Sequence, residues 1–403
     1  MDSRSSPTGG LFEFIILGDS NGYAGSIPRP EPAFGAVTKA GRLAKLSFSL
    51  AAKSESLLRT PMINDLKKLI EQSERILITS HIGPDGDAVS SSLLLYQLLR
   101  ENYPDKLIEV TLEERPYGLD FLQNYESIKF QPLDTALEKA APDLFVILDA
   151  NALYRLTRAP ESAQKYLETK KPKIIVIDHH EGLEFPDPDV YINNKSPAVA
   201  LDIYDIFIDK LGYKKPEGYA ETALTGIYTD TGGFVHRNMN FQRTFEVVSK
   251  LIADGANIES VANHLSLISE GGLKILGELI ANTTFESDHI YTYISDKSAH
   301  PDNHEAMVQG TDAFRSNFLR EVKGRSWGFI VQRDVEAHND NTYSVSFRAV
   351  SGTKDVSEIA ARLGGGGHKP AAGAKFSAKN VEDALRKVRA AINGSSAGAV
   401  DED

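Results

Sequence analysis

The chain has 403 residues, no cysteine and a formal net charge of −12. Its length allows two or three domains, and the lack of cysteine excludes disulfides, a thiol nucleophile and a zinc–thiolate site. The negative charge argues against binding a long nucleic acid, which needs many lysines and arginines on phosphates. No apolar run approaches the roughly 20 residues that span a bilayer. We therefore expect a cytoplasmic protein without a membrane segment. A small phosphorylated ligand could still bind, because metals and a few local basic residues can offset the negative charge.

Residues 1–61 differ from the rest of the chain. They contain a proline-rich run at 28–32 and show no clear hydrophobic periodicity. Such a composition is typical of a disordered leader or of an over-extended translation start, and we favour both over a targeting segment around Lys39–Arg59. An amphipathic helix at Met62 then opens the ordered part of the chain.

From Met62 onward the pattern alternates strands and helices. Strands are expected at Arg75–Ser80, Leu107–Leu112, Leu144–Leu148 and Lys173–Ile177. Helices are expected at Ser90–Leu99, Val199–Leu211, Tyr219–Thr229 and Phe241–Asp254. Continuous apolar strands between helices are typical of a parallel sheet that is buried on both faces. We therefore predict an α/β domain over residues 62–257, with a parallel sheet covered by helices on both sides.

The pattern changes after residue 257. Residues 258–285 are expected to form a helical linker that Gly271 and Gly272 interrupt. Beyond it, apolar and polar residues alternate in the strands expected at Ile290–Ser295, Trp327–Asp334 and Thr342–Val350. Alternation indicates a sheet with one exposed face. We predict a smaller α+β lobe over 286–393 and an acidic tail over 394–403.

Oxygen and imidazole donors follow the strands of the first domain. They are His81, Asp85, Asp87, Asp149, Asp178, His179 and His180, and Asp230 joins them after a helix. The carboxyl ends of parallel strands meet at one edge of a sheet, where ligands bind. Aspartate and histidine without cysteine favour Mn²⁺ or Mg²⁺ over structural zinc. Several carboxylates also allow one to bridge two ions about 3.5–4 Å apart, as in metal-assisted phosphoryl hydrolysis.

The histidines fall into two groups. Adjacent residues at a strand end point to opposite sides, so we expect only one of His179 and His180 to face the metals. Five others have no partner motif and are expected at the surface or satisfied in the core: His264, His289, His300, His304 and His338. His236, close after Asp230, is left open.

A glycine run near the C-terminus is a candidate anion site. It consists of Gly364, Gly365, Gly366 and Gly367, followed by His368. Without Cβ atoms in the way, backbone N–H groups can turn toward an anion. Arg348 shares one face of its strand with Ser344 and Ser346, and could bind a phosphate beside the glycines. A flexible glycine hairpin with a solvated Arg348 is the alternative.

These motifs are similar to those of the DHH phosphoesterase family, which is named after the signature that stands here at Asp178-His179-His180. The resemblance extends over residues 62–393 in four ordered blocks: His81–Asp87, Asp149, Asp178–His180 and Asp230. Gly364–Gly373 resembles the glycine-rich motif of the DHH-associated C-terminal domain. The two-domain layout is most similar to the bifunctional oligoribonuclease and pAp phosphatase branch.

The resemblance implies two Mn²⁺ ions, for which Mg²⁺ or Co²⁺ could substitute, with the substrate in a cleft between the lobes. It assigns one metal to His81 and Asp85, the other to Asp87, His179 and Asp230, and the bridge to Asp149. It places His180 on the scissile phosphate. It implies that Arg348 and His368, with Gly364–Gly367, hold another phosphate or nucleotide group.

Two departures from the family pattern concern the surroundings of this site. Ser90 stands where many relatives carry glycine, and Ala198-Val199-Ala200 stands where relatives often have small hydroxyl residues. The second departure bears on the substrate rather than on the chemistry.

We therefore predict an Mn²⁺-dependent enzyme that hydrolyses short 5′-phosphorylated oligoribonucleotides or 3′-phosphoadenosine 5′-phosphate (pAp) with a metal-activated water. A cyclic-dinucleotide or pApA phosphodiesterase is the first alternative. A nucleotide-binding regulator without catalysis is the second, although no metal carboxylate is missing. A homodimer is left open.

Overall fold

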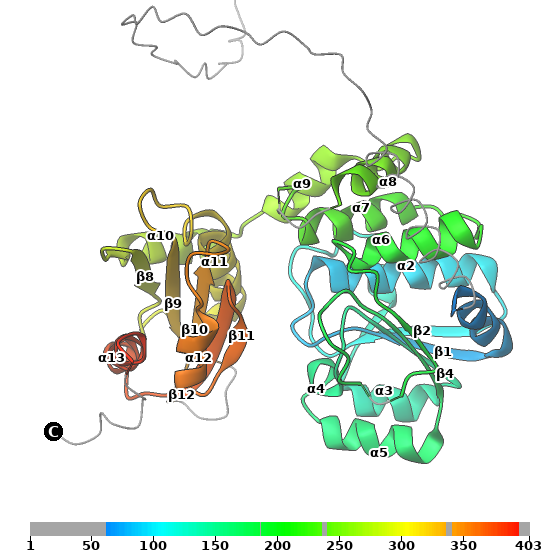
Figure 1. Cartoon of the computed structure of the whole chain (residues 1–403), viewed down its shortest axis with the longest axis horizontal. Helices are drawn as coiled ribbons and strands as arrows, with labels where there is room; N and C mark the ends of the chain where they lie inside the picture. The colour runs from blue at the N-terminus through cyan, green and yellow to red at the C-terminus, as the bar shows by residue number, and fades with distance from the viewer. Residues whose placement is uncertain (1–61, 186, 236–239, 336–340, 395–403) are drawn as a thin grey trace, which may run out of the picture. The chain divides into compact units, whose positions relative to one another are not determined.

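The computed structural model describes residues 62–185, 187–235, 240–335 and 341–394. The expectations for the leader over 1–61, for the tail beyond residue 394, and for His236 and His338 lie outside these residues. The described chain forms two six-stranded sheets (Figure 1). None of its described helices is long and apolar enough to cross a membrane.

The first sheet is parallel throughout and has the strand order β3-β2-β1-β4-β5-β6. Its strands are β1 (Arg75–Thr79), β2 (Leu107–Leu112), β3 (Ile128–Phe130), β4 (Leu144–Leu148), β5 (Lys173–Ile177) and β6 (Val190–Ile192). The predicted parallel sheet is thus confirmed, while the three-residue strands β3 and β6 at its two edges are new.

Helices cover both faces of this sheet (Figure 1). One face carries the helix over 62–72, α2 (Gly86–Asn102), α6 (Val199–Ile203), the π-helix η2 (Tyr204–Lys210), α7 (Tyr219–Asp230), α8 (Phe241–Ala253) and α9 (Ile258–Ser266). The other carries α3 (Leu133–Ala140), α4 (Leu153–Leu156) and α5 (Pro160–Lys170). Within β1, Ile76 and Ile78 pack into the first core and Leu77 into the second. Both faces of the strand are apolar because both are buried.

The second sheet is mixed and has the order β11-β12-β10-β9-β8-β7. Its strands are β7 (Thr284–Phe285), β8 (His289–Tyr293), β9 (Trp327–Arg333), β10 (Thr342–Ala349), β11 (Gly366–His368) and β12 (Ala371–Ser377). Its helices are α10 (Glu270–Ala281), α11 (His304–Asn317), α12 (Ser357–Arg362) and α13 (Val381–Ile392), and the 3₁₀ turn η3 (Pro301–Asn303) precedes α11. A second 3₁₀ turn, η1 (Tyr125–Ser127), precedes β3 of the first sheet. Buried and half-buried residues alternate along β10, as predicted.

The helical stretch after residue 257 differs from the expectation. Gly271 and Gly272 do not interrupt a helix but lie in the first turn of α10, where the Ser269 hydroxyl accepts a hydrogen bond from Gly272 N at 3.0 Å. A Cβ at Gly272 would lie 2.9 Å from Gln309 Cβ, so glycine permits the close approach of α10 and α11. Val261 of α9 packs in the core of the first sheet and Ile275 of α10 in that of the second. The domain limits themselves stay a prediction.

Candidate metal-binding site

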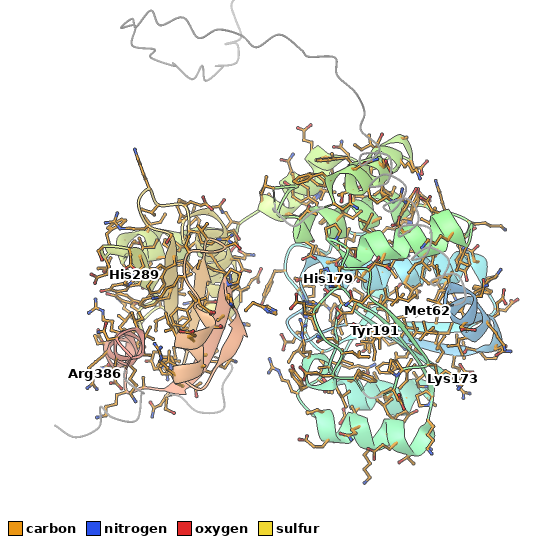
Figure 2. The ribbon with its side chains drawn as sticks, in the orientation of Figure 1. Met62, Lys173, His179, Tyr191, His289 and Arg386 are labelled. Carbon is orange, nitrogen blue, oxygen red and sulfur yellow. The ribbon has the colours of Figure 1, made fainter. Side chains whose placement is uncertain are left out.

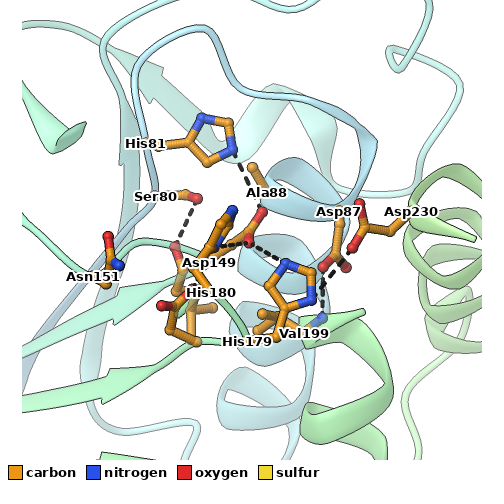
Figure 3. Close-up of polar contacts among 12 residues, drawn as sticks. Ser80, His81, Asp87, Ala88, Asp149, Asn151, His179, His180, Val199 and Asp230 are labelled. Carbon is orange, nitrogen blue, oxygen red and sulfur yellow. Dashed lines mark hydrogen bonds and ion pairs between the residues drawn. The ribbon is translucent and has the colours of Figure 1, made fainter. Parts of the chain in front are cut away.

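The strand order places the predicted donors at a topological switch point. β1 and β4 are neighbours, and from them the chain continues toward opposite edges of the sheet. Ligands of open parallel sheets bind at such a point, outside the carboxyl ends of the strands. His81, Asp85 and Asp87 follow β1, and Asp149 follows β4. Figure 3 shows His81, Asp87 and Asp149 at this site.

Asp85 and Asp87 are held by the start of α2. Asp85 is the N-cap, and its Oδ1 accepts hydrogen bonds at 3.1 Å from the backbone N–H groups of Asp87 and Ala88. This cap starts α2 at Gly86, earlier than the predicted Ser90. The Asp87 carboxylate is fully buried and accepts hydrogen bonds from the N–H groups of Val199 (2.6 Å) and Ala200 (2.9 Å) at the start of α6.

Asp149 occupies the centre of the site. Its carboxylate is buried, and three imidazole nitrogens surround it: His81 Nε2 at 3.4 Å, His179 Nε2 at 3.2 Å and His180 Nδ1 at 3.5 Å. Its φ angle is +56°, in the left-handed region that residues with a Cβ rarely adopt. Backbone strain of this kind persists where the surroundings enforce it, and it gathers at functional sites.

His179 and His180 both approach Asp149, so the expectation that they point apart is wrong. β5 ends at Ile177, and the alternation of a strand therefore does not extend to these residues. Their rings lie edge to face with centroids 4.7 Å apart. His179 Nδ1 lies 3.1 Å from the Ser196 carbonyl oxygen, while His180 Nδ1 lies 2.8 Å from the buried Asp178 Oδ1.

Crowded carboxylates shift the pKa values of the site. Burial, followed by the charges of Asp149 and Asp230, raises the pKa of Asp87 well above its ordinary range. Burial also raises the pKa of Asp230 to about 7, against the opposing effect of His179. Burial disfavours the imidazolium form of His81, but the negative charges of Asp149 and Asp85 have a larger effect and raise the pKa of His81 to about 9. The cluster thus holds more negative charge than its imidazoles offset, which is the condition that bound cations relieve.

The donors form overlapping sets that fit metal ions. Their ligand atoms lie within 4.8 Å of one another in three groups: His81 with Asp85 and Asp149, Asp87 with His179 and Asp230, and Asp149 with His179 and His180. All six predicted ligands are thus brought together, and Asp149 belongs to two of the three groups. Carboxylate oxygen and imidazole nitrogen suit Mn²⁺ and Mg²⁺. The assignment of each donor to one of two metals stays a prediction.

Two further polar residues at this site were missed from the sequence. Asn151 donates from Nδ2 to the carbonyl oxygens of Glu181 (3.0 Å) and Gly182 (3.1 Å), just after the two histidines. Arg155, in α4, places Nη2 3.4 Å from His180 Nε2. The only signal in the sequence was their position two and six residues after Asp149.

The second sheet carries the remaining candidates. Gly366, Gly367 and His368 form strand β11 rather than an open loop, and they pair with β12 in an antiparallel hairpin. Arg348 and His368 both stand opposite Ala371 in the register, one on either side of β12. Burial, together with Arg315 and Arg320, lowers the pKa of Arg348 to about 10. Arg315 forms an ion pair with Asp312, but the three arginines together still leave an excess of positive charge, which favours anions in this part of the lobe.

Gly364 and Gly365 lead into this hairpin. Gly364 has a φ of +79°, and a Cβ at Gly365 would lie 2.1 Å from the Gly373 carbonyl oxygen. Glycine is therefore needed here for the close approach of two backbones, whether or not an anion binds.

His264 and His289, two of the isolated histidines, stack on aromatic rings. His264 stacks on Phe121 with ring centroids 4.3 Å apart, and His289 stacks on Trp327 at 4.1 Å. Figure 2 marks His289 in the second sheet and His179 beside the first, just after β5.

Comparisons with known proteins agree with this geometry. The N-terminal domain of the DHH family matches residues 75–227, and the DHHA1 domain matches residues 291–394. The bifunctional oligoribonuclease and PAP phosphatase NrnA of Thermus thermophilus is 26% identical over 318 residues, covering 79% of this chain and 89% of that protein. NrnA of Mycoplasma pneumoniae is 27% identical, covering 82% and 96%.

Two other similarities are informative. The cyclic-di-AMP phosphodiesterase GdpP of Geobacillus thermodenitrificans is 26% identical over 81% of this chain, but over only 48% of its own length. The crystal structure of an exopolyphosphatase-related protein from Bacteroides fragilis matches with a TM-score of 0.70 and 24% identity, covering 83% of this chain and 96% of that chain. That structure has the same fold.

Proposed function

This chain belongs to the DHH family, with both its N-terminal domain and the DHHA1 domain, and on that premise we propose that it hydrolyses short 5′-phosphorylated oligoribonucleotides and pAp. The names of the NrnA relatives support this choice of substrates. The single observation that carries it is the gathering of carboxylates and imidazoles around Asp149 at the switch point of the first sheet.

We assign one divalent metal to His81 and Asp85, a second to Asp87, His179 and Asp230, and the bridge to Asp149. Bound there, the two ions would supply an activated water and offset the charge of the phosphoryl oxygens. The donor set favours Mn²⁺, with Mg²⁺ or Co²⁺ as substitutes.

The chain's own residues hold the substrate in place. Asp178 Oδ1, 2.8 Å from Nδ1, fixes the ring of His180. With both ring nitrogens protonated, Nε2–H would then donate to an oxygen of the scissile phosphate. Arg348 and His368 of the second sheet bind another phosphate or nucleotide group, for which a guanidinium fork is well suited. A substrate with two phosphates then gains more from the chain than one with a single phosphate.

The proposal extends to Mn²⁺ as the metal bound in the cell and to a cytoplasmic location, and it leaves a homodimer open. Metal analysis of protein from unsupplemented cells tests the metal, and cell fractionation tests the location. Analytical ultracentrifugation tests the oligomeric state.

The test is a turnover panel with pAp, pApA, a five-nucleotide RNA, cyclic di-AMP and pyrophosphate, with Mn²⁺ and after chelation. We expect hydrolysis of pAp, pApA and the short RNA that stops on chelation. The match to GdpP favours one rival, a cyclic-dinucleotide phosphodiesterase. Preferred hydrolysis of cyclic di-AMP would establish that rival, and no turnover of any substrate would leave a nucleotide-binding regulator.

A further inference from the structure

Arg155 brings a positive charge to the edge of the metal-binding site. It lies in α4, six residues after Asp149, and its Nη2 is 3.4 Å from His180 Nε2. Its carbonyl oxygen accepts a hydrogen bond from Ile82 N at 2.7 Å, which fastens α4 to the segment that follows β1. This hydrogen bond joins the segment after β1, which carries His81, to the segment after β4, which carries Asp149 and Arg155. The backbone of Arg155 is thus fixed relative to both metal-binding segments.

The guanidinium has donors to spare. It offers five N–H bonds, yet its side-chain contacts are long: 3.4 Å to His180 and 3.5 Å from Nη1 to Asn151 Oδ1. Ordinary N–H···O hydrogen bonds are 2.7–3.2 Å. Neither contact therefore uses the fork that arginine presents to a pair of oxygens.

No carboxylate pairs with Arg155 in the part of the chain that the structure describes. The neighbouring Arg158, three residues on, forms an ion pair with Glu114 at 2.5 Å, and Arg243 pairs with Asp209 at 2.5 Å. Arg155, by contrast, has no such ion pair, although several aspartates lie in the site beside it. A half-buried guanidinium without a carboxylate partner, next to a phosphate-handling histidine, is suited to a phosphate that arrives with the substrate.

The net charge of the site also favours a phosphate-binding role for Arg155. Five aspartates surround it, namely Asp85, Asp87, Asp149, Asp178 and Asp230. Two divalent ions would not fully offset five carboxylates, so an incoming phosphate gains from one more fixed cation. Arg155 is that cation on the side where His180 Nε2 points.

We propose that Arg155 is a substrate-binding residue whose guanidinium holds a non-bridging oxygen of the phosphate that His180 contacts. The inference rests on the proposed function, because it takes the ligand to be a phosphoester. A purely positioning role, in which Arg155 only orients the His180 ring, makes a different prediction: the turnover number falls while phosphate affinity is kept.

The experiment compares Arg155→Ala and Arg155→Lys with the control Arg158→Ala, which removes the same charge from an ion-paired position nearby. Calorimetry measures the affinity of AMP, and then of inorganic phosphate, for the Mn²⁺-loaded chain, and elemental analysis measures its metal content. We expect Arg155→Ala to bind AMP about ten-fold to a hundred-fold more weakly, as for the loss of a charge-assisted pair. Arg155→Lys, which keeps the charge without the fork, should fall between, and Arg158→Ala should match the wild type. Metal content should be equal in all four proteins.

Wild-type affinity in Arg155→Ala overturns the inference, and so does a fall in kcat on pApA with AMP affinity unchanged. If Arg155→Ala misfolds, Arg155→Lys decides in the same way. A wild-type chain that binds neither AMP nor phosphate also overturns it. A wild type that turns over none of the panel refutes the proposed function instead, and AMP binding still decides the role of Arg155.

Discussion

Gly226 tests whether close packing holds Asp87 in place. It is the eighth residue of the twelve-residue helix α7, and a Cβ there would lie 2.6 Å from Ala200 Cβ and 2.8 Å from Asp87 Oδ1. Neither neighbour is the free end of a long side chain, and Asp87 is pinned by two backbone N–H groups. Gly226→Ala must therefore displace α6 or the carboxylate.

Gly277 provides a matched control. It is the eighth residue of the twelve-residue helix α10, and an added Cβ meets nothing within 4 Å. Alanine in place of glycine inside a helix stabilises by roughly 0.5–1 kcal/mol, a gain common to both variants. Overpacking costs about 1–3 kcal/mol at Gly226 alone. Gly277→Ala should thus be more stable than the wild type, and Gly226→Ala less stable than Gly277→Ala by about 1–3 kcal/mol.

Urea denaturation followed by circular dichroism gives the free energies of unfolding, and the fluorescence of Trp327, the single tryptophan, reports on the second sheet separately. Bound Mn²⁺ per chain is measured on the same samples, and we expect it to fall only in Gly226→Ala. Equal stability of the two variants, with full metal in both, would refute the argument that Gly226 holds Asp87 in place.

Three further changes test other parts of the site. Asp149→Ala should abolish hydrolysis and lower metal occupancy at both positions, because one carboxylate serves both; full occupancy by elemental analysis would remove Asp149 from the site. Arg348→Ala should raise KM for pApA about ten-fold to a hundred-fold without loss of metal, and it should lower activity on pyrophosphate by a smaller factor. If steady-state kinetics show that activity falls by the same factor on both substrates, Arg348 instead supports the fold. Burial raises the pKa of Asp202 from 3.8 to about 6, so this carboxyl favours the fold below about pH 4 and loses that contribution as the pH rises through 6. The stability of the wild type relative to Asp202→Asn should therefore fall by roughly 2 kcal/mol between pH 4 and 7, and a pH-independent difference in urea denaturation would contradict it.

Much of the first sheet could be predicted because its central strands are buried on both faces. β1, β4 and β5 read as continuous apolar runs for that reason. β3 and β6 have three residues each, too few for any periodicity to show. The glycines of β11 carry no strand signal at all, since their pairing with β12 is decided by the neighbouring strand.

The candidate site was predictable to a similar degree. The donors gather because parallel strands end at one edge, which is a general property of this fold class. The directions of His179 and His180 were not predictable, because they depend on irregular backbone after β5. Arg155 was missed because a lone arginine in a short helix has no pattern, and only its contact with His180 gives it a role.

The most direct test of the central claim is anomalous diffraction from crystals of the Mn²⁺-loaded chain. We predict two manganese peaks about 3.5–4 Å apart, bridged by Asp149, with His81 and Asp85 on one ion and Asp87, His179 and Asp230 on the other. A single peak, or two peaks without Asp149 between them, would contradict the two-metal site on which the proposed function depends.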